Sequence, residues 1–226
     1  MLYNRVHSFA EFHHTVDHYR AQSRWIFRGQ ADASWTLIPK AGRPPYNNLS
    51  DHHAYNYWRF SAVEHHNDPS ANEWDWLALA QHHGLATRLL DWTYNPLVAA
   101  FFSVREDCHG DAAVYALRSK RHLDIDVGDP FELEGIGWFT PKRTDPRISH
   151  QAGAFTLHGP PTLPLAEGKH PEYELVKITI DKKYRTDLLR ELEHLYVHEA
   201  FLFPDLDGLS SYVNWKWSKR NRWVDE

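Results

Sequence analysis

The chain has 226 residues, a formal net charge of −5 with histidine neutral, and 42% hydrophobic residues. This hydrophobic content predicts a packed core rather than a disordered chain, and the length suits one domain. The net charge argues against a general nucleic-acid binder, because such domains are strongly basic. With Cys108 as its single cysteine the chain forms no internal disulfide, and no run approaches the roughly 18 apolar residues of a membrane span. We therefore expect a cytoplasmic protein with no membrane contact.

Seventeen histidines raise the question of a metal site. Eight of them form four adjacent pairs, and adjacent residues on a helix or strand point in different directions. His14 and His18 have the spacing that places two imidazoles on one helical face, but zinc needs a third and usually a fourth ligand. The sequence therefore predicts no metal site.

The N-terminal segment predicts a helix followed by two short strands. Ser8 begins a capping box, and apolar residues follow it at helical spacing, so a helix is expected within residues 1–24. Residues 25–27 and 34–38 predict short strands, the first of them ending in a sharp turn at Gly29.

The next segments predict two helices, a short strand and a third helix. The two helices are expected at about residues 49–65 and 73–83, and the strand at residues 87–91. Residues 97–104 are apolar almost all round, which predicts a buried helix.

The C-terminal half predicts two core strands, at residues 112–117 and 173–180, separated by loops and a short strand near 154–157. Residues 182–196 predict an amphipathic helix, and residues 209–217 a weaker one. Helices and strands mix without regular β-α-β alternation, and no glycine-rich phosphate loop is present. We therefore predict an α+β fold with a twisted, mostly antiparallel or split sheet flanked by helices.

We expect a single domain over residues 1–226, with residues 216–226 as a basic and aromatic tail. Lys216, Lys219 and Arg220 lie there among tryptophans, and this composition is able to bind single strands by stacking. The simpler interpretation is a solvated tail that packs through its tryptophans.

Arg28 is the first candidate site residue, because it lies between an apolar strand and Gly29. We expect its guanidinium to project from a sheet end where a ligand is able to approach. The planar guanidinium suits phosphate or carboxylate. The alternative is a structural salt bridge to Asp91 or another core carboxylate.

Polar residues also interrupt the otherwise apolar segment QHHGLATRLLDWTYNP at residues 81–96. Burial of Arg88 and Asp91 is costly unless they are paired, so a structural pair between them is one interpretation. Thr93 and Asn95 are expected as plain helix caps.

The functional interpretation of this segment places Asp91, Trp92 and Thr93 at a strand end beside Arg28. The indole then offers a stacking surface, and the threonine a hydroxyl, to a flat, nucleotide-like ligand. Both interpretations stay open from the residues alone.

Several ordered motifs resemble the FRG domain family, named for its Phe-Arg-Gly motif. They are FRGQ at 27–30, WTLIPKAGR at 35–43, WDWLALAQHHGLATRLLDWTYNPLVAAFFSV at 74–104, RISHQAGAFTLHG at 147–159 and LFPDLDGL at 202–209. The resemblance spans nearly the whole chain and departs from the family pattern at Ala86, where a proline is expected. The resemblance implies that the chain is an FRG domain, but it does not indicate an activity.

The order of these motifs is also similar to the ADP-ribosyltransferase fold. In that fold an Arg-Gly, a Ser/Thr-rich strand before a helix, and a late acidic strand together bind NAD. The similarity implies that Arg28 contacts a phosphate or ribose of NAD, and that Thr93 and Trp92 shape the nicotinamide pocket.

The third element of that pattern is incomplete, because Gln151 stands where the fold has a glutamate. Cleavage of NAD passes through a cationic, oxocarbenium-like state that a carboxylate stabilises and a glutamine does not. Asp91, Glu199 or Asp205 would have to enter the pocket from another segment.

We therefore expect one pocket whose catalytic residues are Arg28, Thr93 and Gln151 and whose other ligand contacts are Gly29, Gln30, Gln81, Thr87, Arg88, Asp91 and Trp92. The leading hypothesis is an NAD-using transferase or glycohydrolase, as an effector of a toxin or phage-defence system. Its macromolecular acceptor, protein or nucleic acid, stays open. The alternatives are a non-catalytic module that binds a nucleotide, RNA or protein, and a hydrolase with His82 or His83 as general base.

Overall fold

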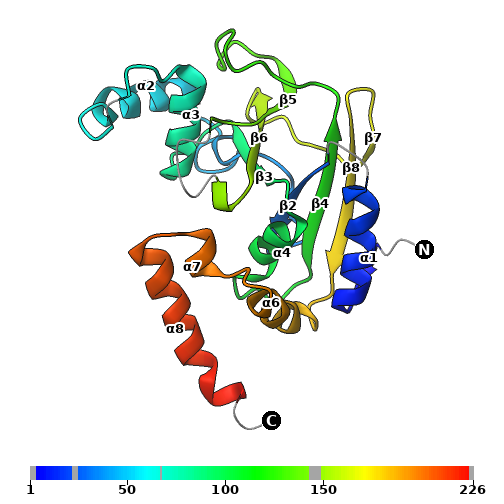
Figure 1. Cartoon of the computed structure of the whole chain (residues 1–226). Coiled ribbons are helices and arrows are strands. Elements are labelled where there is room, and N and C mark those ends of the chain that lie inside the picture. The colour runs from blue at the N-terminus through cyan, green and yellow to red at the C-terminus, as the bar shows by residue number, and fades with distance from the viewer. Residues whose placement is uncertain (1–3, 22–24, 67, 143–148, 224–226) are drawn as a thin grey trace.

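A computed structural model describes residues 4–21, 25–66, 68–142 and 149–223, with side chains as far as residue 218 (Figure 1). Its strands are β1 (Arg5–Val6), β2 (Ile26–Gln30), β3 (Leu89–Thr93), β4 (Ala112–Ser119), β5 (Gly135–Phe139), β6 (Gly153–Gly159), β7 (Gly168–Lys169) and β8 (Tyr173–Ile180). Its helices are α1 (Phe9–Arg20), α2 (Asp51–Ala62), α3 (Glu73–His82), α4 (Pro96–Val104), α6 (Arg185–His194), α7 (Glu199–Leu202) and α8 (Leu206–Trp223), with a 3-10 turn at Lys40–Gly42.

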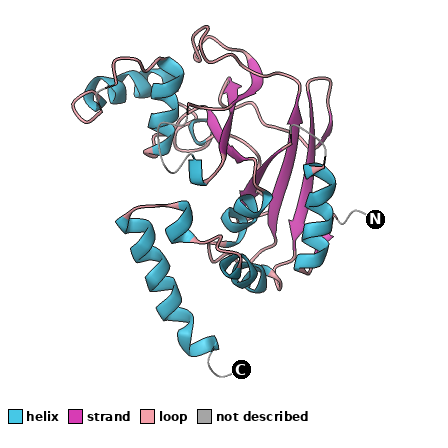
Figure 2. Ribbon diagram, in the orientation of Figure 1, coloured by secondary structure: helices cyan, strands magenta, loops and turns pink. Residues whose placement is uncertain are grey.

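The strands join one eight-stranded sheet in the order β1-β8-β4-β2-β3-β6-β5, with β7 paired to β8. β1 and β8 run parallel, and the other pairs are antiparallel. Helices flank this mixed sheet (Figure 2). The predicted α+β fold with a mostly antiparallel sheet is therefore confirmed.

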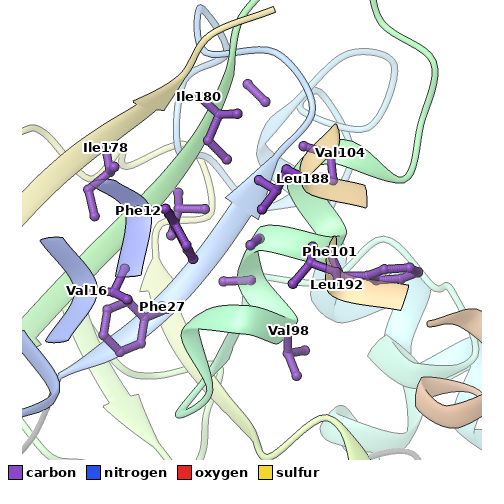
Figure 3. Packing of buried hydrophobic residues seen from close by; sticks show 14 of the residues in the cluster. Phe12, Val16, Phe27, Val98, Phe101, Val104, Ile178, Ile180, Leu188 and Leu192 are labelled. Atoms are coloured by element: carbon purple, nitrogen blue, oxygen red, sulfur yellow. The ribbon is translucent and has the colours of Figure 1, made fainter. Parts of the chain in front are cut away.

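One face of the sheet packs against α1, α4 and α6 (Figure 3). α1 begins as predicted, because the Ser8 hydroxyl accepts a hydrogen bond from the Glu11 amide at 3.3 Å. Phe12 and Val16 then point into the core beside Phe27 of β2. Burial of such side chains contributes roughly 1.5–3 kcal/mol each. This layer holds β2 in the middle of the sheet.

A second cluster lies where α2 and α3 meet β3, β5 and β6. α3 begins with a complete capping box at Asn72, whose side chain accepts from the Asp75 amide at 3.0 Å. Trp74 packs edge-on against Phe139 of β5 at 5.1 Å between ring centroids. α3 is thereby fixed next to β3, which brings its C-terminal end toward β2.

The structure corrects the first two predicted strands. β2 does not end at Phe27 but continues to Gln30, so Arg28 lies inside a strand and Gly29 makes no turn. Residues 34–38 form no strand and contribute only an isolated bridge between Leu37 and Leu165. Whether each segment forms a strand therefore depends on a neighbouring strand to pair with, and not on the alternation of apolar residues in its sequence.

Gly29 is required by packing rather than by a turn. A Cβ added there would lie 2.0 Å from the Ala99 carbonyl oxygen and 2.6 Å from the Ser103 amide nitrogen, both in the backbone of α4. We expect Gly29→Ala to lower the free energy of unfolding by about 3 kcal/mol, because backbone atoms have no room to withdraw. Chemical denaturation measures this loss.

Gly110→Ala is the matched control, since a Cβ at Gly110 meets nothing within 4 Å. It should leave the free energy of unfolding within about 0.5 kcal/mol of the parent. Equal stability of the two variants would contradict the close approach of β2 and α4.

Among the described residues, no helix combines the length and the apolar character that crossing a lipid bilayer requires.

Of the predicted tail, residues 224–226 and the side chains of residues 219–223 lie outside the described part. Lys216 lies inside it and pairs with Glu193 at 2.9 Å.

Candidate functional site

The candidate site opens where the central sheet divides. β2 pairs with β4 over five residues, but it pairs with β3 only through Phe27 and Thr93. Beyond that pair the two strands separate, and a pocket of about 350 Å³ lies there. This volume falls within the range of roughly 300–1,000 Å³ found for ligand sites. We call it the Arg28 pocket.

Most of the predicted site residues line this pocket. Those that do are Arg28, Gly29, Gln30, Gln81, Asp91, Trp92, Thr93 and Gln151. Thr87 and Arg88 are absent from its lining. The segments predicted to meet therefore do meet, with two exceptions that have structural roles.

The Arg28 side chain crosses the gap between β2 and β3 and is 17% exposed. Its Nη1 donates to the Asp91 carbonyl oxygen at 2.7 Å and lies 3.6 Å from the Asp91 carboxylate. Burial lowers the pKa of Arg28, while the Asp91 carboxylate raises it and the positive Arg43 lowers it. Its Nε is buried with no partner among the described residues. Arg28 therefore keeps a buried positive charge and an unused donor at the pocket.

Gln30 lies two residues further along β2, on the same face as Arg28 because side chains alternate along a strand. It is only 6% exposed, and its Oε1 has no hydrogen-bond partner in the described part of the chain. Buried polar atoms are nearly always partnered, so each exception needs an explanation. The wall thus offers one free donor and one free acceptor to a bound group.

Asp91 supplies a carboxylate at the mouth of the pocket, where its side chain is 60% exposed. Gln81, near the end of α3, donates to it through Nε2 at 2.9 Å. Thr87 donates in turn to the Gln81 side-chain oxygen at 2.5 Å. Thr87 therefore orients Gln81 from outside the pocket.

Thr93 and Gln151 also line the pocket, and both side chains donate hydrogen bonds to backbone carbonyl oxygens. The Thr93 hydroxyl donates to the Gln151 carbonyl oxygen at 2.6 Å, and the Gln151 amide donates to the Leu202 carbonyl oxygen at 3.1 Å. Asn95, not Thr93, is the side-chain cap of α4, accepting from the Leu97 amide at 3.0 Å. The Gln151 side chain is thus engaged with the segment before α8.

Arg88 does not reach the pocket and does not pair with Asp91. It is buried and forms a two-point salt bridge with Asp51 at the start of α2, at 2.7 and 2.9 Å. Its guanidinium also donates to the Phe131 carbonyl oxygen at 3.1 Å and lies over the Phe131 ring. The expectation of a structural arginine–aspartate pair is correct in kind, but its acidic partner comes from 37 residues earlier.

The pocket also contains residues that the sequence did not indicate: Trp35, Arg43, Phe102, Glu106 and Phe203. Arg43 adds a second positive charge to the wall, and Glu106 a second carboxylate. Trp35 and Arg43 belong to one quoted FRG motif, Phe102 to a second and Phe203 to a third, which is the one signal that could have selected these four residues.

Asp91, Glu199 and Asp205 were the three carboxylates considered as replacements for the missing glutamate, and the structure places them differently. Glu199 pairs with Arg105 at 2.9 Å, away from this pocket. Asp205 accepts from the Gly208 amide at 2.8 Å and caps the start of α8. Of the three candidates only Asp91 lines the Arg28 pocket.

His82 lines the Arg28 pocket, whereas His83 does not. The two rings meet edge-on at 4.9 Å. Among the described residues, no group of three or more histidine, cysteine or acidic side chains is placed to hold a metal ion.

A buried hydrogen-bond chain supports Trp92 from behind. The Trp92 indole donates to the Thr156 hydroxyl at 2.9 Å, which lies 3.0 Å from His158 Nε2, and His158 Nδ1 lies 2.7 Å from the Leu163 carbonyl oxygen. A neutral His158 with its proton on Nδ1 satisfies every member of this chain. Burial lowers the pKa of His158 to about 4, against a smaller opposing effect of the Leu163 carbonyl.

This pKa predicts loss of stability in acid. An unfolded histidine has a pKa near 6.5, so between about pH 6.5 and pH 4 the unfolded chain binds a proton that the folded chain does not. The free energy of unfolding should fall by about 3 kcal/mol over this window because of His158. Urea denaturation from pH 7 to pH 4, compared between the parent and His158→Gln, isolates the contribution. Parallel curves for the parent and His158→Gln would refute the assignment.

These features define an α+β domain with a polar, partly cationic pocket in a divided sheet. Residues 23–112 match the FRG domain model, which confirms the predicted FRG domain over this range. The matched range carries Arg28 and Asp91 but ends before Gln151. No curated protein and no solved structure matches the chain, so the similarity to the ADP-ribosyltransferase fold stays a hypothesis.

Proposed function

We propose that the Arg28 pocket binds NAD and that the protein consumes it, by ADP-ribosyl transfer or by hydrolysis. The supporting observation is the buried Arg28 charge, whose Nε has no partner in the described part of the chain and whose Nη1 lies 3.6 Å from the Asp91 carboxylate. Gln30, which lines the same pocket, adds a side-chain carbonyl oxygen that is also unpartnered there. A guanidinium suits a phosphate, and a donor beside an acceptor suits the amide or base edge of a nucleotide.

Cleavage of NAD is assisted by a carboxylate that lies next to the ribose carbon on which positive charge develops. Cleavage of the bond between ribose C1′ and the nicotinamide nitrogen leaves positive charge on the ribose, and nicotinamide departs neutral. In hydrolysis, water adds to C1′ and releases a proton. We assign the stabilising role to Asp91, because the Gln151 amide is already bound to the Leu202 carbonyl oxygen.

The aromatic lining supports a flat ligand. Trp35, Phe102 and Phe203 add rings to the pocket wall beside the polar groups of β2 and β3. Base–aromatic stacking contributes about 1–3 kcal/mol per base. A dinucleotide is able to use both the charged and the aromatic parts of such a wall.

The cellular setting of this proposal is the cytoplasm, where NAD is abundant and the single Cys108 stays reduced. An acceptor protein or nucleic acid would receive the ADP-ribosyl group in the transferase version. A role as a toxin or phage-defence effector is part of the proposal on the ground of the family resemblance alone, and the pocket itself does not indicate it.

Asp91→Asn tests the catalytic assignment. We expect this isosteric change to slow nicotinamide release from NAD by about 100-fold, the effect of losing one positioned carboxylate. Chromatography of the purified protein incubated with NAD, with and without cell extract as acceptor source, measures the release. Calorimetry should show that NAD still binds.

The control for this variant is Asp17→Asn, which removes a carboxylate from the exposed side of α1. It should release nicotinamide at the parental rate. If the parent protein neither releases nicotinamide nor binds NAD, the proposal is wrong.

A second candidate function is nucleotide binding without turnover. The exposure of Asp91 favours it, because solvent screens an exposed carboxylate and weakens its effect on a developing charge. Saturable binding of NAD or a mononucleotide with no nicotinamide release would establish this alternative.

A further inference from the structure

A second pocket, of about 240 Å³, lies at the C-terminal ends of α4 and α6, where α7 and α8 cross them. We call it the His198 pocket. Figure 1 shows α7 and α8 following α6 on the side of the molecule where α4 lies. The residues that carry its chemistry are Arg105, Glu106, Glu193, His198, Glu199 and Tyr212. Glu106 also lines the Arg28 pocket, so the two pockets are neighbours.

His198 places a buried, unpartnered ring nitrogen at this pocket. It is only 7% exposed, yet its Nδ1 has no hydrogen-bond partner among the described residues. The ring is fixed by stacking on Tyr212 at 4.2 Å and 17° between planes. Burial lowers the pKa of His198, which favours the neutral ring. With its proton on Nε2, a neutral ring presents Nδ1 as an acceptor.

The charges around the pocket favour a cation. Glu199 pairs with Arg105 at 2.9 Å, and Glu193 pairs with Lys216 at 2.9 Å. Glu106 has no ion-pair partner in the described part of the chain. Three carboxylates therefore face two cations, which leaves one negative charge in excess.

Two further features add to this preference. α4 ends at Val104 and α6 at His194, and the carbonyl end of a helix carries partial negative charge. Burial also raises the pKa of Glu199 despite the opposing effect of Arg105, so a further positive charge nearby would stabilise its ionised form.

The rings in the pocket favour a flat cation. Tyr212 stacks on His198, and Trp215 lies nearly parallel to Tyr212, at 20° and 6.3 Å between centroids. A guanidinium is planar, stacks on aromatic faces and donates several hydrogen bonds at once. An ammonium is compact and strongly hydrated and uses such a stack less well.

We propose that the His198 pocket binds an alkylguanidinium cation, which donates to His198 Nδ1 and to the Glu106 carboxylate and lies beside the aromatic rings of Tyr212 and Trp215. The cation comes either from a free small molecule or from an arginine side chain of another protein. Its place beside Glu106 puts it next to the Arg28 pocket. The inference does not depend on what the Arg28 pocket binds.

Calorimetry on the full chain, without NAD, tests the proposal with two matched pairs of probes. Butylguanidinium and its neutral analogue butylurea represent the free source, and the peptides Gly-Arg-Gly and Gly-citrulline-Gly represent the side-chain source. At least one guanidinium probe should bind saturably, and its neutral partner should bind at least about tenfold more weakly. The probe that binds more tightly identifies the source.

Two variants locate the binding. His198→Phe keeps the stacked ring and removes the acceptor, so it should weaken binding about tenfold or more. The melting temperature should not fall, since Nδ1 has no hydrogen bond to any residue that the structure describes. Glu106→Gln removes an exposed charge and should also weaken binding, which keeps the test valid if His198→Phe misfolds. No saturable binding of either guanidinium probe, equal binding of a neutral analogue, or parental affinity in the folded variants would overturn the proposal.

Discussion

Arg28→Met is expected to reduce NAD affinity by about 100-fold or more and to stop nicotinamide release, while the melting temperature stays within about 3 °C of the parent. The affinity falls because a ligand phosphate loses a buried, desolvated positive charge. Stability is kept because burial of the Arg28 charge is unfavourable, and its interaction with Asp91 offsets this cost only in part. An apolar side chain of similar size has no such desolvation cost. Isothermal calorimetry and thermal unfolding measure the two quantities.

Arg20→Met is the control for loss of one arginine, because Arg20 lies on the exposed side of α1. It should change neither affinity nor stability. A large fall in the melting temperature of Arg28→Met with unchanged NAD affinity would instead show that Arg28 is a structural partner of Asp91.

Arg88→Met is expected to give the largest loss of stability, about 3–5 kcal/mol. The Arg88 and Asp51 side chains are 8% and 9% exposed, so removal of the guanidinium leaves a buried carboxylate without its cation. Urea denaturation at pH 7 measures the loss. Nicotinamide release per folded molecule should stay at the parental level, because Arg88 does not line the Arg28 pocket.

The double variant Arg88→Met, Asp51→Leu provides the control. Replacing both members of a buried pair by apolar residues leaves no unpaired charge, so most of the lost stability should return. If the double variant is as unstable as Arg88→Met alone, the loss comes from packing against Phe131 rather than from the salt bridge.

The sequence by itself determined the features that depend on neighbouring residues. The caps at Ser8 and Asn95 were predicted, because a cap and the amides it binds lie within three residues of each other. The strand at residues 173–180 was predicted with its observed bounds, since apolar and β-branched residues dominate it. The resemblance in motif order also suggested that Arg28 lies near the segment around Asp91.

Only the tertiary structure decided which distant residues meet. β5 contains two glycines and no clear alternation, and it is a strand because β6 pairs with it. Arg88 was expected to pair with nearby Asp91, yet α2 brings Asp51 to it. Glu106, on no recognised pattern, faces both pockets because α4 ends between them. These contacts depend on strand register and helix packing over long sequence separations, where hydrophobic burial and charge pairing act through space and leave no local pattern.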